Sequence, residues 1–126
     1  MDRIIVSTKK APAAVGPYSQ GVVAGDFVFT AGTLPLHPQT GDVVGEDITT
    51  QTRQAISNLA SVLKAAGSSV DKVVKTTVFL TDMDNFGGMN SVYSEFFASN
   101  PPARSTVQVG PLAKGSLIEI EAIAVR

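Results

Sequence analysis

The sequence predicts one α+β domain whose β-sheet is covered on one face by two long helices. Short runs rich in β-branched and aromatic residues are typical of strands, and two longer stretches repeat apolar residues every three or four positions, as helices do. These segments follow the order βββαβαββ along the chain. A chain of 126 residues, 44% of them apolar, forms one domain, residues 1–126, with an ordinary core.

The N-terminal part of the chain is expected to form three strands and two ordered loops. Gly25 and Asp26 form the turn between the second strand and the third. The segments 11–18 and 33–45 are rich in proline and glycine, which favours loops over helices. The three strands are expected at residues 3–7, 19–24 and 26–31.

Two helices are expected from apolar residues at helical spacing. The first covers residues 49–66, with Asp47 placed to cap its N-terminus and Gly67 placed to end it. The second covers residues 84–98, and an Asn-Pro-Pro run ends it. The apolar residues that define the two helices are Ala55, Leu59, Val62, Leu63 and Ala66, then Phe86, Met89, Tyr93, Phe96 and Phe97.

The remaining strands, at residues 73–80, 103–109 and 117–125, indicate which face of the sheet the helices cover. Neighbouring residues of a strand point to opposite faces. One face of the last strand is fully apolar and suits the helices: Ile118, Ile120, Ala122 and Ala124. The uncovered face is expected to carry apolar residues among its charges: Val73, Phe79, Ile123 and Val125. Such a face is too apolar for solvent, so we expect burial against another copy.

The composition excludes several classes of protein. Ten basic and eleven acidic residues leave a net charge of −1, so we expect no nucleic-acid partner. No run of residues is long and apolar enough to span a membrane, and no targeting segment is evident, so cytoplasmic residence is expected. The absence of cysteine excludes disulfides, zinc–thiolate sites and thiol catalysis. The single histidine, His37, lies between prolines and is interpreted as structural, so no metal site is expected.

Charged residues of the last two strands are the candidates for chemistry. If these strands form a hairpin, Arg104 and Thr106 lie across from Glu121 and Glu119. An arginine near a glutamate at an apolar interface has two interpretations. It is either a structural ion pair or a site where the guanidinium binds a substrate carboxylate and the glutamate handles water. The pattern alone leaves both open.

Four motifs, in order along the chain, resemble the RidA family of enamine/imine deaminases. They are Ala11-Pro-Ala-Ala-Val-Gly-Pro-Tyr-Ser-Gln-Gly, Val74-Lys-Thr-Thr-Val-Phe-Leu-Thr-Asp-Met, Pro102-Ala-Arg-Ser and Ile118-Glu-Ile-Glu-Ala-Ile-Ala. The resemblance implies a chorismate-mutase-like mixed β-sheet, no cofactor, and a homotrimer with sites between subunits. It also implies hydrolysis of 2-aminoacrylate, 2-iminobutanoate and related 2-imino acids to 2-oxo acids and ammonia. These reactive intermediates are released by pyridoxal-phosphate-dependent dehydratases.

The resemblance also implies roles for particular residues. Arg104 takes the position of the carboxylate-binding arginine, and Glu119 that of the glutamate that orients and deprotonates water. Glu121 is interpreted as a structural partner of a basic residue. The substrate-binding positions fall on Tyr18, Gly32, Asn90 and Thr106.

Some of these positions also have a plain structural interpretation, and two depart from the family pattern. Tyr18 could be a loop aromatic packed on an interface, and Asn90 could brace the backbone of its helix. The family often has cysteine where this chain has Thr106 and serine where it has Ala31. Both departures leave less side-chain hydrogen bonding to the substrate.

The sequence leaves two other functions open. Family members have been described as translation-inhibiting ribonucleases, but this chain has a net charge of −1 and no pair of histidines for RNA cleavage. The second alternative is a non-catalytic protein that binds small carboxylates, or a chaperone-like trimer. Thr106 and Ala31 keep that alternative open.

Overall fold

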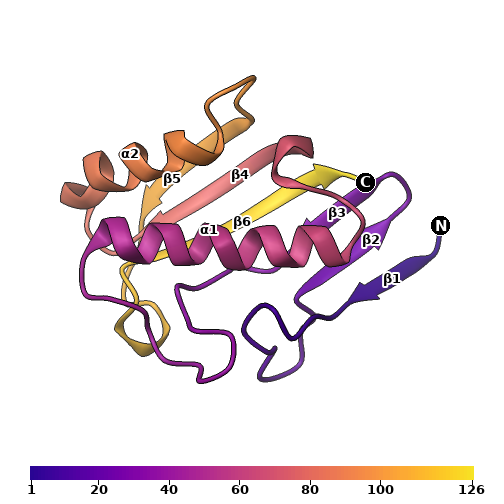
Figure 1. Cartoon of the computed structure of the whole chain (residues 1–126), viewed down its shortest axis with the longest axis horizontal. Helices are drawn as coiled ribbons and strands as arrows, with labels where there is room; N and C mark the ends of the chain where they lie inside the picture. The colour runs from indigo at the N-terminus through magenta and orange to yellow at the C-terminus, as the bar shows by residue number, and fades with distance from the viewer.

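Six strands form a single mixed sheet in the computed structural model, which describes all 126 residues. They are β1 (Arg3–Val6), β2 (Gly21–Ala24), β3 (Phe27–Thr30), β4 (Val73–Leu80), β5 (Ala103–Gln108) and β6 (Ile118–Val125). Their order across the sheet is β1-β2-β3-β6-β4-β5 (Figure 1). All neighbours are antiparallel except β4 and β5, which are parallel. The C-terminal strand therefore lies inside the sheet, and β5 forms one edge.

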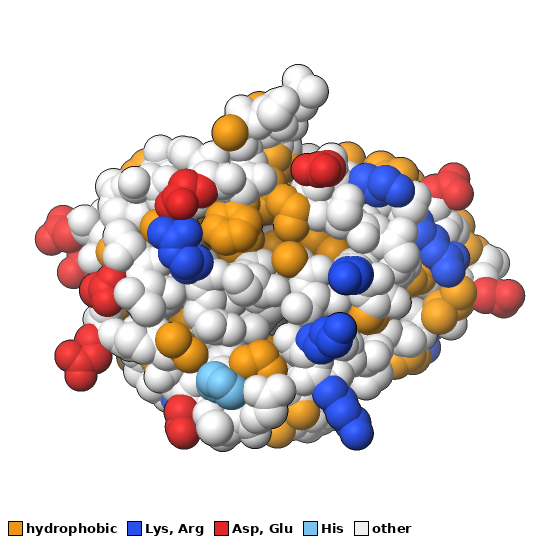
Figure 2. Space-filling view, viewed as in Figure 1, with side chains coloured by type: hydrophobic (Ala, Val, Ile, Leu, Met, Phe, Trp, Pro, Cys, Tyr) orange, Lys and Arg blue, Asp and Glu red, His pale blue; other side chains and the backbone are white.

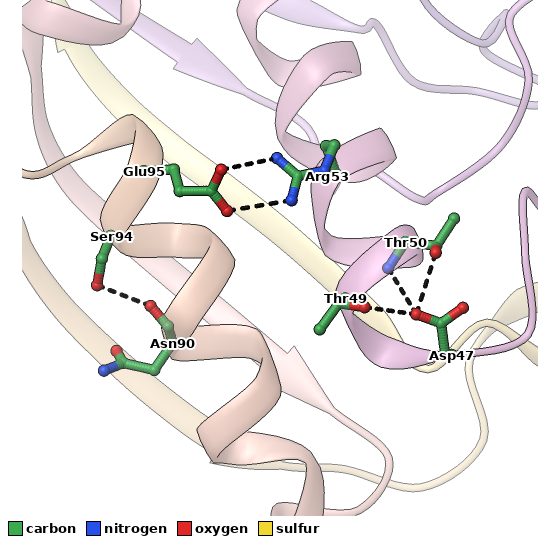
Figure 3. Close-up of polar contacts among 7 residues, drawn as sticks. All are labelled: Asp47, Thr49, Thr50, Arg53, Asn90, Ser94 and Glu95. Carbon is green, nitrogen blue, oxygen red and sulfur yellow. Dashed lines mark hydrogen bonds and ion pairs between the residues drawn. The ribbon is translucent and has the colours of Figure 1, made fainter.

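Both helices, α1 (Ile48–Ala65) and α2 (Phe86–Phe96), lie against the same face of the sheet (Figure 1). The predicted cap of α1 is confirmed, because Asp47 accepts a hydrogen bond of 3.0 Å from the Thr50 N–H (Figure 3). Hydrogen bonds from the Thr49 hydroxyl, the Thr50 N–H and the Thr50 hydroxyl lower the pKa of Asp47 to about 2. Just beyond the C-terminus of α1, Gly67 adopts a φ of 82°, a backbone conformation that favours glycine.

The start of α2 differs from the expected helix over residues 84–98. The residues Met83–Asn85 form a 3₁₀ turn, and the α-helix begins at Phe86. Gly88 brings α2 close to α1, because a Cβ placed there would lie 2.6 Å from Ile48 Cγ2. Arg53 of α1 and Glu95 of α2 join the two helices through two N–H···O bonds of 3.1 Å (Figure 3).

The core lies between the sheet and the two helices. The predicted inner face of β6 is confirmed, since its four apolar residues are buried against side chains of both helices. The largest buried members are Ile56, Leu59, Leu63, Leu80, Met89, Ile118 and Ile120. Viewed from the helix side, Figure 2 shows acidic and basic side chains spread around the surface, with apolar side chains among them. Neither helix is long and apolar enough to cross a membrane.

Two expectations about the strands are wrong. The last two strands form no hairpin, because β4 lies between β5 and β6. The β4–α2–β5 segment is a crossover through a helix, and such a connection makes its two strands parallel neighbours. Val73 is buried in the core rather than on the uncovered face, because a bulge between Val73 and Lys75 shifts the alternation by one residue.

The face of the sheet opposite the helices is left uncovered by this chain. Phe79, Ile123 and Val125 lie on it as expected. Cross-strand partners add Phe27, Phe29 and Val107, three of the exposed large apolar side chains of the chain. We call these six residues and the surface around them the open face.

Buried side-chain amides hold the two N-terminal loops in place. Gln20 donates hydrogen bonds to the carbonyls of Thr8, Ala11 and Pro12, and so shapes the loop 11–18. Asn58 of α1 donates to the carbonyls of Leu34 and Leu36 at 2.9 and 2.8 Å, and so fixes the loop 33–45. Each buried amide satisfies backbone groups that a loop cannot pair by itself.

Candidate active site

Arg104 lies on the helix-facing side of the edge strand β5. It is the register partner of Thr76, whose side chain points into the core. Its Nη1 donates a hydrogen bond of 2.7 Å to Asn90 Oδ1, and its guanidinium carbon lies 4.7 Å from the centre of the Tyr93 ring. Arg104 makes no ion pair, so its other N–H groups are available to a ligand.

A groove of about 560 Å³ opens beside Arg104, between α2 and the edge of the sheet. Thr106 lies two residues further along β5 on the same face, as the partner of Val78. Its hydroxyl oxygen is buried and has no hydrogen-bond partner within the chain. A buried hydroxyl without a partner is unfavourable, which makes it an available donor or acceptor. We call Arg104, Asn90, Tyr93 and Thr106 the arginine cluster.

Glu119 lies on the open face, beside Gly32. Thr33 and Ile120 exchange two backbone hydrogen bonds of 2.7 and 3.0 Å, which bring the backbone of Gly32 against the glutamate side chain. A Cβ at Gly32 would lie 2.7 Å from Glu119 Cδ, so only glycine leaves room for this carboxyl group. Burial raises the pKa of Glu119, and the carboxylate of Glu121 raises it further. A raised pKa moves a carboxylate towards the range that suits a general base.

Tyr18 lies on the same side of the molecule as Gly32. Both residues line a cavity of about 170 Å³ beneath the loop 11–18. The Tyr18 hydroxyl accepts a hydrogen bond of 3.3 Å from the Val15 N–H, which closes a turn of that loop. The tyrosine side chain is about half exposed and forms a wall of the cavity. We call Glu119, Gly32 and Tyr18 the glutamate cluster.

The structure therefore divides the predicted site residues between two clusters. The expected approach of Arg104 and Glu119 is wrong within one chain, because β4 separates their strands and the two side chains leave opposite faces of the sheet. Two strand spacings amount to about 10 Å. Glu121 is not hydrogen-bonded to a basic residue, since Lys75 donates instead to Ser105 Oγ at 2.9 Å.

Sequence reasoning missed the contact between Tyr93 and Arg104. Tyr93 was assigned to the core because it belongs to the apolar stripe of its helix, and it is indeed buried. Its spacing of three residues from Asn90 places both side chains on one face of α2, which is the signal that points to a shared partner.

His37 has the structural role that the sequence predicts. Its Nδ1 accepts hydrogen bonds from the backbone N–H groups of Gln39 and Thr40 at 3.2 and 3.4 Å, which stabilises a turn. The chain brings together no group of three or more His, Asp or Glu side chains that could hold a metal ion.

The fold and the two clusters define a class of protein: a mixed six-stranded sheet with two helices on one face and separate arginine and glutamate clusters. The chain belongs to the endoribonuclease L-PSP family, which includes the RutC and RidA proteins, and the family model matches residues 8–126. This confirms the resemblance and the predicted α+β fold.

Relatives of known name and structure cover nearly the whole chain. A RutC family protein of Pyrococcus horikoshii is 50% identical over 95% of both chains. The 2-iminobutanoate/2-iminopropanoate deaminase of Mus musculus is 46% identical over 98% of this chain and 92% of its own. The crystal structure of Escherichia coli TdcF with bound serine shares 46% identity and 98% of each chain, with a TM-score of 0.93.

Proposed function

We propose that the protein is a hydrolytic deaminase of reactive enamine and imine intermediates. It would convert 2-aminoacrylate, 2-iminobutanoate and related 2-imino acids to 2-oxo acids and ammonia, and so remove damaging metabolites. The deaminases of mouse and human, 46% and 44% identical to this chain, support the reaction class. The observation that carries the proposal is the guanidinium of Arg104, which is held in place but has no carboxylate partner within the chain.

Arg104 suits the carboxylate that every substrate of this class contains. A guanidinium presents parallel N–H groups that bind a carboxylate through two hydrogen bonds. Asn90 occupies one N–H and the Tyr93 ring lies against the guanidinium, so the remaining donors are directed to a ligand. Asn90 is therefore assigned to holding the arginine rather than to touching the substrate.

Glu119 is the group that would activate water. The carbon of a protonated imine is already electrophilic, so the site has only to place a water molecule about 3 Å from it and move protons. The water oxygen forms a bond to this carbon while its proton passes to Glu119. Glu119 then passes this proton to the nitrogen. The C–N bond breaks and ammonia leaves as the hydroxyl group gives its proton to Glu119 and the C=O bond of the 2-oxo acid forms. Gly32 and Thr106 are assigned to the polar atoms of the substrate, and Tyr18 to a wall of the pocket.

We infer that a complete site forms between two copies of the chain. Arg104 and Glu119 lie on opposite faces of one sheet, so the arginine cluster would meet Glu119 on a neighbouring copy. A contact between two different surfaces forms a closed ring when the rotation between copies permits it, and a homotrimer is one such ring. The apolar open face supports association, since large exposed patches of this kind mark interfaces.

The test is turnover of freshly generated 2-iminobutanoate, followed through release of ammonia. Arg104→Ala is expected to lower kcat/KM about a hundredfold, because it removes one partner of a desolvated charge pair. Arg53→Ala is the matched control, since Arg53 is exposed, paired with Glu95 and belongs to neither cluster. Turnover that Arg104→Ala leaves within twofold of the wild type contradicts the assignment.

The same preparations decide between the deaminase and the two alternatives. Ligand binding without turnover would favour a non-catalytic carboxylate-binding protein. The description of the family model raises the ribonuclease alternative. That alternative gains support only if RNA cleavage persists through purification and disappears in the Glu119→Gln variant.

A further inference from the structure

Tyr93 and Thr76 form a buried pair directly against Arg104. Their hydroxyl groups share a hydrogen bond of 2.8 Å, and the two residues are 5% and 0% exposed. The Tyr93 ring also contacts the Phe97 ring, with 4.5 Å between their centres. The ring is therefore fixed at its oxygen by β4 and along its side by the end of α2.

The guanidinium cation of Arg104 lies over the face of the fixed Tyr93 ring. The guanidinium carbon lies 4.7 Å from the centre of the Tyr93 ring and 5.5 Å from that of Phe86. A cation over an aromatic ring is attracted by the negative face of the ring, most strongly where water is excluded. Together with the hydrogen bond to Asn90 Oδ1, this contact restricts a long side chain that otherwise has many rotamers.

We propose that Tyr93, held by Thr76, is a positioning residue for Arg104: its ring fixes the guanidinium so that the free N–H groups face the substrate carboxylate. The inference rests on the proposed function, in which Arg104 binds that carboxylate. Tyr93 acts through Arg104 and touches no reacting atom. The carboxylate is present in substrate and transition state alike, so loss of this positioning raises KM and leaves kcat nearly unchanged.

The phenol group of Tyr93 is suited to this role and not to acid–base chemistry. Burial raises the pKa of Tyr93, whereas the hydrogen bond shared with Thr76 and the charge of Arg104 partly offset this effect. The phenol therefore stays neutral, and its single bond to Thr76 keeps it directed into the core.

Three variants separate the ring, its hydroxyl group and the surrounding core. Tyr93→Leu removes the ring and the hydroxyl but keeps an apolar side chain. Tyr93→Phe keeps the ring and loses the bond to Thr76. Val92→Ala is the matched control, because it removes a buried side chain of the same helix that does not line the groove beside Arg104.

Two measurements are made on each folded variant. The first is the KM and kcat for 2-iminobutanoate, and the second is the Kd for the unreactive carboxylate 2-oxobutanoate by titration calorimetry. Tyr93→Leu is expected to raise KM and Kd about tenfold with kcat within about twofold, and Tyr93→Phe to raise them about threefold. Val92→Ala is expected to keep the wild-type values even if it unfolds at a lower temperature.

The outcomes separate this inference from the proposed function. Equal KM and Kd in Tyr93→Leu and Val92→Ala overturn the positioning role, while an active wild type leaves the deaminase proposal standing. A wild type without turnover, whose Kd still rises about tenfold in Tyr93→Leu, removes the deaminase and supports the positioning role. A wild type that binds no carboxylate overturns both. If Tyr93→Leu does not fold, Tyr93→Phe and Thr76→Val decide, and unchanged KM and Kd in both overturn the inference.

Discussion

Glu119 combines a half-buried carboxyl group with a close acidic neighbour, and this has a consequence for stability. Burial and Glu121 raise the pKa of Glu119, so the folded chain binds this proton more tightly than the unfolded chain does. The favourable contribution is present below the unfolded pKa and is lost as the pH rises through the folded pKa. At neutral pH the ionised glutamate therefore opposes folding, which is common for groups retained for catalysis.

Glu119→Gln is expected to abolish turnover and to raise the melting temperature at pH 7, because glutamine removes the buried charge. The gain should shrink as the pH falls through the raised pKa of the wild-type carboxyl group, and it should disappear below the ordinary glutamate pKa of about 4.3. Glu95→Gln is the control with the opposite sign, since its ion pair with Arg53 lowers the pKa of Glu95. Melting curves across this pH range test both, and a Glu119→Gln variant no more stable than the wild type at pH 7 refutes the prediction.

At the scale of single residues, the sequence predicted which residues belong to the site better than it predicted the side chains that they contact. The motifs indicated Arg104 and Glu119, but the sequence placed them across a hairpin that does not exist. Tyr93 was predicted to lie in the core, which is correct, yet an aromatic residue that packs in a core and one that also contacts a cation show the same helical spacing. Such contacts depend on the neighbouring strand, which local pattern does not reveal.

At the scale of elements, α1 and α2 approach each other at Gly88, one of two adjacent glycines of α2 that have different surroundings. A Cβ on Gly88 would meet Ile48 of α1, whereas nothing lies within 4 Å of a Cβ on Gly87. The helix therefore contains one glycine that packing requires and one that packing does not require.

Gly88→Ala is expected to destabilise the fold by about 1–3 kcal/mol, because Ile48 or the helix must shift to make room. Gly87→Ala, its matched control, is expected to stabilise by about 0.5–1 kcal/mol, because alanine reduces the freedom of the unfolded chain. Urea unfolding of both variants gives the two free energies. Equal changes of the same sign would show that the contact with Ile48 is unimportant.

The elements that local signals define were predicted well. Asp47 and Gly67 bound α1 as expected, and the strand at residues 73–80 has the predicted limits. Pairing was harder, because the partner of β5 depends on the crossover through α2. The bulge near Val73 was also missed. Val73 and Val74 are both valine, so the sequence does not show which of the two side chains faces the core.

At the scale of the whole molecule, the main feature is the open face, which no element of the chain covers. Phe27, Phe29 and Val107 are each more than two-fifths exposed on this flat surface. The sequence predicted an apolar uncovered face from the alternation in β4 and β6, and the structure enlarges it with β3 and β5. Large exposed apolar patches of this kind mark interaction sites, so the proposed contact between copies can be tested on this face.

Phe29→Asp is expected to give a folded monomer without turnover. The side chain is 43% exposed in the chain, so the charge is tolerated there, but it cannot be buried in an interface. Light scattering after size exclusion gives the mass, and circular dichroism checks the fold. Ser57→Asp, on the exposed side of α1, places the same charge away from the open face. An unchanged mass for Phe29→Asp would exclude this face as the interface.

Because the proposed site combines Arg104 of one copy with Glu119 of the next, two inactive variants are expected to restore each other. When Arg104→Ala and Glu119→Gln chains are co-expressed in equal amounts, hybrid rings contain junctions where an intact arginine faces an intact glutamate. Random mixing makes about one junction in four intact, whatever the number of copies in the ring. About a quarter of wild-type activity should therefore return, whereas pairing either chain with the double variant should return none.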